Sequence, residues 1–106
     1  EYVLSAVKGR FIAHTRACLP GVYGYPVIAA RKVHLTSKPV ELIEDLLAVA
    51  APQATVLDPF MGGGSVGEAC IRTDRSYIGM ELSPEYYEIS RSRLTAVLAG
   101  RENEAK

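Results

Sequence analysis

Two stretches of the chain carry apolar residues at helical spacing. In TSKPVELIEDLLAVAAP (36–52), Ser37 is suited to an N-cap, Pro39 to the first turn and Pro52 to the stop. The apolar face between them consists of Leu42, Ile43, Leu46, Leu47 and Val49. The pattern therefore predicts an amphipathic helix across this stretch.

The second helical stretch is SPEYYEISRSRLTAVLAG (83–100). Ser83 is a suitable N-cap, Pro84 occupies the first helical position, and Gly100 is a typical stop. We expect the charged run 85–93 to form a solvated face of this helix.

Shorter segments complete an alternating order. ATVLDPF (54–60) and RSYIGMEL (75–82) are predicted strands, separated by glycines and a short helix SVGEACIRT (65–73). EYVLSAVKGR (1–10) also reads as a strand, and 11–35 as a loop with a short strand in PVIAARKV (26–33). This order is typical of an α/β fold with a mainly parallel sheet.

Composition adds limits to this picture. The chain has 106 residues, enough for one domain or part of one, and its apolar runs are too short for a membrane span of ~20 residues. No basic and apolar leader is visible, and Cys18 and Cys70 match no metal spacing. We therefore expect a cytoplasmic protein with reduced thiols and no metal.

Charge is distributed unevenly although the net charge is zero. Residues 1–40 contain six basic residues and one acidic residue, whereas 41–106 contain six basic and eleven acidic residues. A basic N-terminal part fits a polyanion such as nucleic acid, and a solvated charged face fits equally well.

Glycines follow the predicted strand 54–60. Gly62, Gly64 and Gly67 form the pattern G-x-G-x-x-G at the start of the short helix. Such glycines let a ligand approach the backbone closely at a helix N-terminus. An acidic residue after the next strand can accept hydrogen bonds from ribose hydroxyls. Glu81 lies 19 residues after Gly62 and takes that position. The constellation indicates an adenosine-bearing ligand, the alternative being a ligand-free turn.

Three cofactor classes compete for this loop. No Lys follows the glycines, which excludes a phosphate-binding P-loop. In a nicotinamide dinucleotide site, the carboxylate of Asp58 would repel the pyrophosphate, and Pro59 would interrupt the strand. S-adenosylmethionine has no phosphate and carries an amino group and a sulfonium, which Asp58 favours.

The segment DPFMGGGSVGEACIRTDRSYIGMELSPEYYEISRSRL resembles the cofactor-binding C-terminal part of DNA amino-methyltransferases, which act on adenine N6 or cytosine N4. HLTSKP (34–39) and EYVLSAVKGR are similar to two further elements of that family. The resemblance implies a partial Rossmann-like methyltransferase fold, a three-layer αβα arrangement, with 1–35 as strand and loop and 36–106 as the cofactor-binding βαβ portion.

The resemblance also implies residue roles. Asp58, Pro59, Phe60, Gly62 and Gly64 would form the loop for S-adenosylmethionine, with Phe60 packed against it. Glu81 would hold the ribose, and the methionine end would be contacted by Thr36, Ser37 and Lys38. The family pattern is altered at three places: Leu35 replaces Pro, Gly63 replaces Ser, and Ser65-Val66 replaces Thr-Thr, although Ser65 retains a hydroxyl for the cofactor.

The family's catalytic motif, D/N/S-P-P-Y/W/F, is missing, since the chain has no Pro-Pro pair. We therefore expect a cofactor half-site without catalytic residues. The complete enzyme, from a bacterial or phage system, would bind the double-stranded DNA substrate. A missing N-terminal half or a homodimer would complete the fold. The alternatives are an inactive remnant or interaction module and a nicotinamide-dependent oxidoreductase domain.

Overall fold

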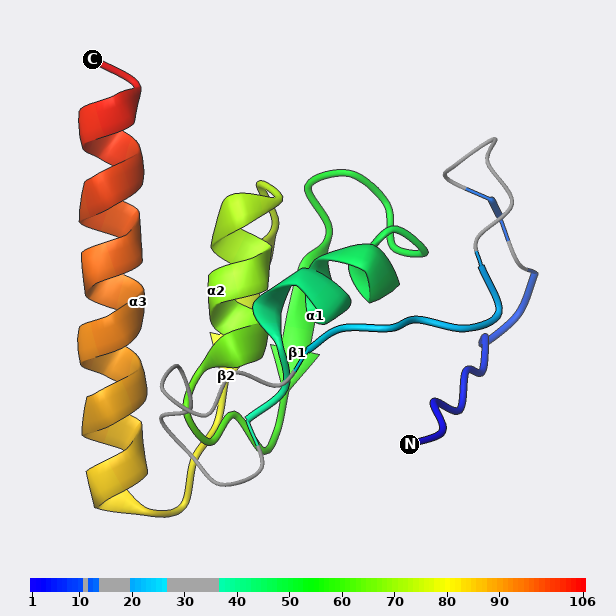
Figure 1. Ribbon diagram of the computed structural model, residues 1–106, viewed down its shortest axis with the longest axis horizontal. Coiled ribbons are helices and arrows are strands. Elements are labelled where there is room, and N and C mark those ends of the chain that lie inside the picture. Colours follow the sequence, from blue (N-terminus) through cyan, green and yellow to red (C-terminus); the bar gives the residue numbers. More distant parts are fainter. Residues whose placement is uncertain (11, 14–19, 27–36) are drawn as a thin grey trace.

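A computed structural model describes residues 1–10, 12–13, 20–26 and 37–106. Its elements follow the order α1 (Val40–Leu47), β1 (Thr55–Asp58), α2 (Ser65–Arg72), β2 (Ser76–Gly79) and α3 (Pro84–Glu104). Figure 1 shows the three helices beside a small sheet, with α3 extending past α2 at its C-terminal end. None of the helices in the described part is both long and apolar enough to cross a membrane.

The strands β1 and β2 pair in parallel, with Thr55 opposite Ser76 and Asp58 opposite Gly79. Helix α2 connects them, which makes a βαβ unit. Successive side chains of a strand point to opposite faces. Val56 and Tyr77 are half-buried, whereas Leu57 and Ile78 are exposed on the other face.

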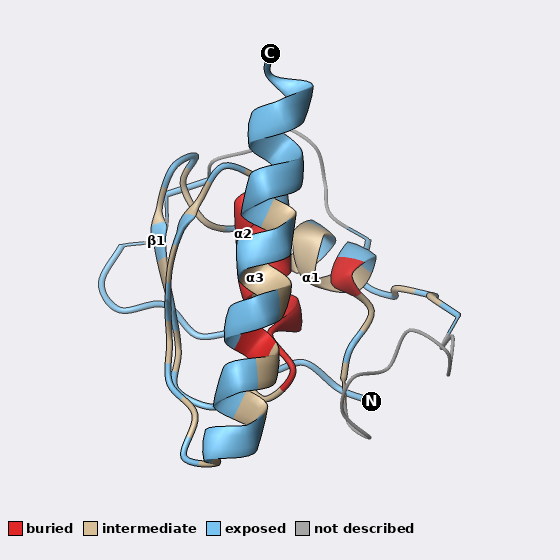
Figure 2. Ribbon diagram, turned by 90° about the vertical axis from the view of Figure 1, so that its left-hand side faces the viewer, coloured by how far each residue is buried: buried red, intermediate tan, exposed pale blue. Residues whose placement is uncertain are grey.

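Helix α2 forms the centre of the core. Ala69 and Cys70 are fully buried, and Figure 2 shows buried residues concentrated in α2 while most of α3 is exposed. Close packing requires glycine at position 67, because a Cβ there would lie 2.7 Å from Tyr77 Cε1 and 2.8 Å from Leu94 Cδ1. Gly67 thus lets the helix approach both β2 and α3.

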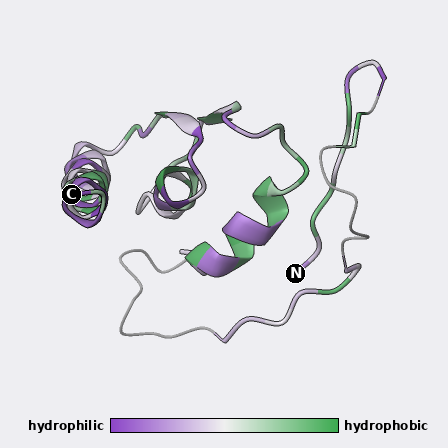
Figure 3. Ribbon diagram, turned by 90° about the horizontal axis from the view of Figure 1, so that it is seen from above, coloured by the Kyte–Doolittle hydropathy of each residue, from purple (hydrophilic) through white to green (hydrophobic). Residues whose placement is uncertain are grey.

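The first helix is shorter than predicted. Pro39 rather than Ser37 occupies the N-cap, with ψ of 133°, and its carbonyl accepts the N–H of Ile43. The helix ends at Leu47, and turns lead to Gln53 at a positive φ of 62° before β1. The predicted amphipathic character is confirmed for α1, and Figure 3 shows hydrophobic and hydrophilic segments following one another along it. Val49, predicted on the apolar face, instead lies beyond the end of the helix and is exposed.

Two further boundaries differ from the prediction. Residues 1–10 are exposed and form no strand, because no neighbouring strand in the described part pairs with them. Gly100 does not end α3, which continues to Glu104. A single glycine costs a helix only about 1 kcal/mol, so the flanking helix-forming residues prevail. The predicted strand at 26–33 lies outside the described residues, except for Pro26.

The remaining predictions of local structure are confirmed. The helix after the glycines spans Ser65–Arg72, one residue less than predicted, and the two strands lie inside their predicted ranges. Ser83 caps α3, since its hydroxyl oxygen accepts the N–H of Tyr86, and Pro84 is the first helical residue.

Candidate functional site

The glycine loop joins the carboxyl end of β1 to α2. Gly62 has a φ of +50° and Gly64, the N-cap of α2, a φ of +83°, conformations that favour glycine. Met61 anchors the loop, since its N–H donates to the Met80 carbonyl and its own carbonyl accepts the N–H of Gly64. The loop therefore presents backbone groups at the start of a helix.

Glu81 lies beside this loop, as its spacing predicts. Its Oε2 accepts the N–H of Gly62 at 2.9 Å, and its Oε1 accepts the N–H of Ser83 at 2.9 Å. The carboxylate therefore joins the loop after β1 to the segment after β2.

Asp58 is held at the end of β1 by two donors. Its Oδ1 accepts the N–H of Phe60 at 3.1 Å, and its Oδ2 accepts the hydroxyl of Tyr77 at 3.1 Å. Burial and the neighbouring charge of Asp58 raise the pKa of Tyr77 well above its ordinary value. The phenol therefore stays protonated and keeps donating to Asp58.

A pocket of about 220 Å³ opens between the start of α1 and the glycine loop. Six of the residues predicted to bind the cofactor line it: Ser37, Lys38, Asp58, Phe60, Gly62 and Ser65. Four other residues complete the lining: Ile43, Met61, Gly63 and Val66. Two segments that are distant in sequence thus meet at one concave site.

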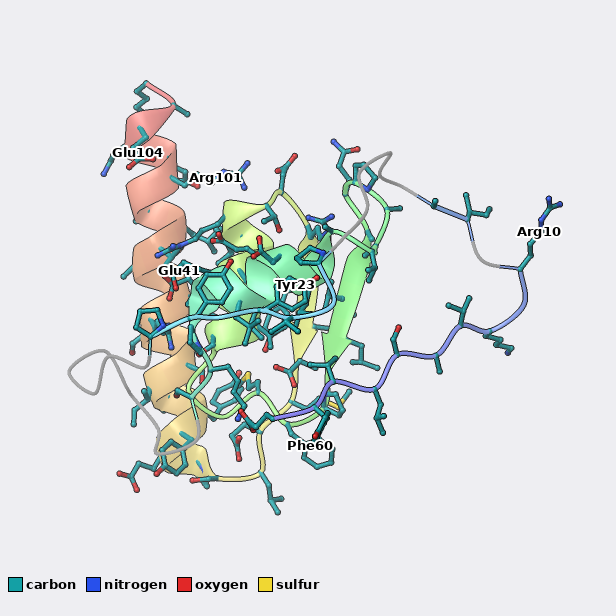
Figure 4. All side chains as sticks on the ribbon, turned by 45° about the vertical axis from the view of Figure 1, so that its right-hand side comes forward. Arg10, Tyr23, Glu41, Phe60, Arg101 and Glu104 are labelled. Carbon is teal, nitrogen blue, oxygen red and sulfur yellow. The ribbon has the colours of Figure 1, made fainter. Side chains whose placement is uncertain are left out.

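The other predicted residues stand differently. Pro59 and Gly64 belong to the loop without lining the pocket, Glu81 accepts a loop N–H and is also absent from the lining, and Thr36 lies outside the described residues. Phe60 is 88% exposed, and Figure 4 shows it at the glycine-loop end of the molecule. Lys38 pairs with Glu1, at 2.5 Å between Nζ and Oε1.

Sequence reasoning missed two residues of α3. The run 85–93 is not uniformly solvated, because Ser90 is fully buried and donates its hydroxyl to the Gly62 carbonyl. Arg93 donates to the Gly63 carbonyl at 2.8 Å. Ser90, Arg93, Leu94 and Val97 fall on the inner face of α3, but apolar and polar residues are too evenly mixed around this helix for periodicity to reveal that face.

The chemistry of the site fits an amino-acid-bearing nucleoside better than a metal. The described residues include no cluster of three or more His, Cys, Asp or Glu side chains that could hold an ion. They do supply a lysine, two oriented carboxylates and a glycine loop at a helix start. A parallel βαβ unit with these features defines a Rossmann-like cofactor-binding fold.

A family model described as DNA methylase (N6_N4_Mtase) matches residues 13–92, so the chain belongs to that family. YubD of Escherichia coli (strain K12) is 41% identical over 97 residues, which cover 91% of this chain and 41% of YubD. The type II methyltransferase M.Cfr9I of Citrobacter freundii is 48% identical over 62 residues, covering 58% of this chain and 21% of that protein. The resemblance predicted from the sequence is confirmed.

Solved structures show the same fold. The M1.HpyAVI–SAM complex matches with a TM-score of 0.60 and 34% identity, over 69% of this chain and 36% of that one. A putative DNA modification methylase from Thermus thermophilus, complexed with S-adenosyl-L-methionine, matches with a TM-score of 0.55 and 34% identity, over 59% and 26%. The predicted α/β, partial Rossmann-like methyltransferase fold is confirmed, and the chain spans less than half the length of these relatives.

Proposed function

We propose that this chain is the S-adenosylmethionine-binding part of a DNA methyltransferase that modifies the exocyclic amine of adenine (N6) or cytosine (N4). The observation that carries the proposal is the pocket lined by Asp58 and the glycine loop, with Glu81 hydrogen-bonded to that loop at Gly62. Its support is the family membership and the two similar structures, which are complexes with S-adenosylmethionine.

The proposed roles follow from the chemistry of the cofactor, which supplies the methyl group when bound. Asp58 provides negative charge for the amino group and sulfonium, and Glu81 accepts ribose hydroxyls. Ser37 and Lys38, together with Thr36, hold the methionine carboxylate. The ion pair of Lys38 with Glu1 is exposed, and such pairs contribute about 0–1 kcal/mol, so a ligand carboxylate can replace it.

The loop residues would complete the cofactor site. Pro59, Gly62 and Gly64 shape the backbone, Ser65 offers its hydroxyl, and the exposed ring of Phe60 packs against the ligand. A dinucleotide fits less well, because its pyrophosphate would meet the carboxylate of Asp58 in the pocket.

The DNA substrate belongs to the complete enzyme. The chain has no Pro-Pro pair, so we propose that a segment outside residues 1–106 supplies the catalytic motif and holds the flipped base. Lys8 and Arg10, both exposed, are available to double-stranded DNA on the basic N-terminal part. The proposed location is the bacterial cytoplasm, in a bacterial or phage system.

Calorimetric titration of residues 1–106 with S-adenosylmethionine and with NAD tests the cofactor. We expect saturable binding of S-adenosylmethionine alone, weakened at least tenfold by Asp58→Ala and by Glu81→Ala. Glu88→Ala is the control, because Glu88 forms an exposed pair with Arg91 away from the pocket. Binding of NAD alone, or unchanged affinity in both site variants, would contradict the proposal.

Activity separates the cofactor part from a complete enzyme. Residues 1–106 should bind the cofactor without methylating double-stranded DNA, whereas a protein that adds the Pro-Pro motif should methylate it. Methyl transfer by residues 1–106 alone would refute this division. Absence of cofactor binding would instead support an inactive remnant or interaction module.

The outer face of the sheet supports a further element of the proposal. Leu57, Ile78 and Met80 are exposed there, and exposed apolar side chains on an open sheet favour association. We propose that a further segment or a second copy of the chain covers them. Residues 1–106 should therefore associate or be poorly soluble, and a monodisperse monomer in light scattering would count against this.

A further inference from the structure

Arg93 of α3 reaches back to the glycine loop. Its Nη1 donates to the Gly63 carbonyl at 2.8 Å and lies 3.5 Å from Ser65 Oγ, while Nε and Nη2 each lie 2.7 Å from Glu68 Oε2. Its side chain is 19% exposed and that of Glu68 is 10% exposed. The guanidinium is therefore shielded from water at the point where the loop enters α2.

Ser90, one turn earlier on α3, holds the adjacent glycines. Its hydroxyl donates to the Gly62 carbonyl, and a Cβ on Gly64 would lie 3.3 Å from the Ser90 Cβ. Together, Ser90 and Arg93 contact all three consecutive glycines. Gly62 and Gly63 line the pocket, whereas Ser90 and Arg93, which hold them, do not.

Such fixation matters because glycine loses more conformational freedom on ordering than any other residue. An unrestrained run of three glycines would have to be ordered by the ligand, which lowers affinity. A loop held in advance by α3 presents its backbone groups without that loss. The planar guanidinium suits this task, since its fixed donors reach a carbonyl and a carboxylate together.

We propose that Arg93, with Glu68, is a positioning residue that holds the glycine loop in its ligand-binding conformation, an inference that rests on the proposed cofactor site. Arg93 does not line the pocket itself, and it contacts the lining residues Gly63 and Ser65. Its contribution to affinity is therefore indirect.

Arg101 offers a matched control on the same helix. Eight residues further along α3, it also joins a carbonyl and a carboxylate of the α2 segment, Ile71 O at 2.6 Å and Asp74 Oδ1 at 2.8 Å. These acceptors lie at the other end of α2, away from the loop. Arg93→Met and Arg101→Met thus remove similar polar contacts between α3 and the α2 segment. Only the contacts of Arg93 involve residues of the site.

Calorimetric titration of residues 1–106 with S-adenosylmethionine compares the two variants. We expect Arg93→Met to raise Kd at least tenfold, Arg93→Lys to recover part of the loss, and Arg101→Met to change Kd less than twofold. Equal effects of Arg93→Met and Arg101→Met would overturn the inference.

A double variant separates positioning from stability. Glu68→Met/Arg93→Met leaves no unpaired buried charge from this pair, and such apolar replacements often preserve the fold. It should keep the melting temperature of the parent chain within a few degrees while its Kd rises as in Arg93→Met. Parental affinity in this folded variant would overturn the inference.

Hydrogen exchange tests the inference without any cofactor. In the free protein, the amides of residues 61–65 should exchange at least tenfold faster in the double variant than in the parent chain. Their exchange rates should be unchanged in Arg101→Met. Unchanged exchange in the double variant would overturn the inference, even if the cofactor binds. If the parent chain fails to bind S-adenosylmethionine, the proposed function fails, whereas faster exchange would still support positioning of the loop.

Discussion

The backbone N–H of Gly62 donates to the carboxylate of Glu81, with 2.9 Å between the nitrogen and Oε2. The two residues follow neighbouring parallel strands, β1 and β2, and meet at the same edge of the sheet. A glycine with positive φ and the proposed ribose acceptor therefore form one unit. A change in either residue is transmitted to the other.

This bond makes Glu81 structural as well as ligand-binding. Glu81→Ala removes the acceptor for the N–H groups of Gly62 and Ser83, so we expect the free energy of unfolding to fall by about 1–2 kcal/mol. Urea denaturation measures this, and Glu81→Gln, which retains one acceptor oxygen, should lie between. A loss in Glu81→Ala no larger than in Glu88→Ala would contradict the bracing role.

A side chain at position 67 should strain the packing of α2 against β2 and α3. In Gly67→Ala the Cβ would meet Tyr77 Cε1 at 2.7 Å, so we expect a loss of about 1–3 kcal/mol from overpacking. Gly100→Ala is the matched control, since position 100 is also helical but has no heavy atom within 4 Å of the added carbon. It should gain about 0.5–1 kcal/mol. Thermal denaturation of both variants showing equal changes would disagree with the packing described.

The buried Tyr77 hydroxyl predicts a loss of stability at high pH. Because its pKa in the folded state is raised above the ordinary 10.0, its contribution is complete below about pH 10 and is lost as the pH rises further. The free energy of unfolding should then fall by up to about 1.4 kcal/mol per pH unit. Tyr77→Phe should lack this part of the slope.

Denaturation between about pH 8 and 11 measures the slope. The raised pKa of the buried Cys70 thiol also lowers stability as the pH rises. Cys70 is present in both the parent chain and Tyr77→Phe, so the difference between their two pH profiles isolates Tyr77. Tyr87→Phe, which alters an exposed tyrosine, should leave the profile unchanged. Parallel profiles for Tyr77→Phe and the parent chain would exclude the predicted effect.

Phe60 should affect affinity without affecting stability. Its ring is 88% exposed, so Phe60→Ala should change the free energy of unfolding by less than about 0.5 kcal/mol. Loss of the proposed contact with the cofactor should raise Kd several-fold in calorimetry. Leu82→Ala, another exposed apolar side chain outside the pocket lining, should change neither quantity. Parental affinity in Phe60→Ala would remove Phe60 from the site.

Local patterns predicted the central part of the fold well. Some residues act on the backbone next to them, so a short stretch of sequence is enough to predict the local structure. These residues are the glycines at 62, 64 and 67 and the N-cap Ser83. Gly100 shows the limit of such signals, because a stop glycine and a tolerated helix glycine look alike in sequence. Residues 1–10 show another limit, since a strand needs a pairing partner that composition does not reveal.

The site was predictable where it depends on sequence spacing and unpredictable where it depends on packing. Asp58 and Glu81 follow paired strands, so their proximity was expected. Ser90 and Arg93 act across about 30 residues of chain, and their sequence context is a charged helix. Only the docking of α3 against α2 shows that these two side chains face inward.

The hold of α3 on the glycine loop also has a consequence for the order of synthesis. Gly63 is made 30 residues before Arg93, the side chain that binds its carbonyl. On the ribosome, β1, the glycines and α2 therefore emerge before the residues that restrain them. The contacts that Ser90 and Arg93 make with the loop can form only after α3 has left the exit tunnel and docked.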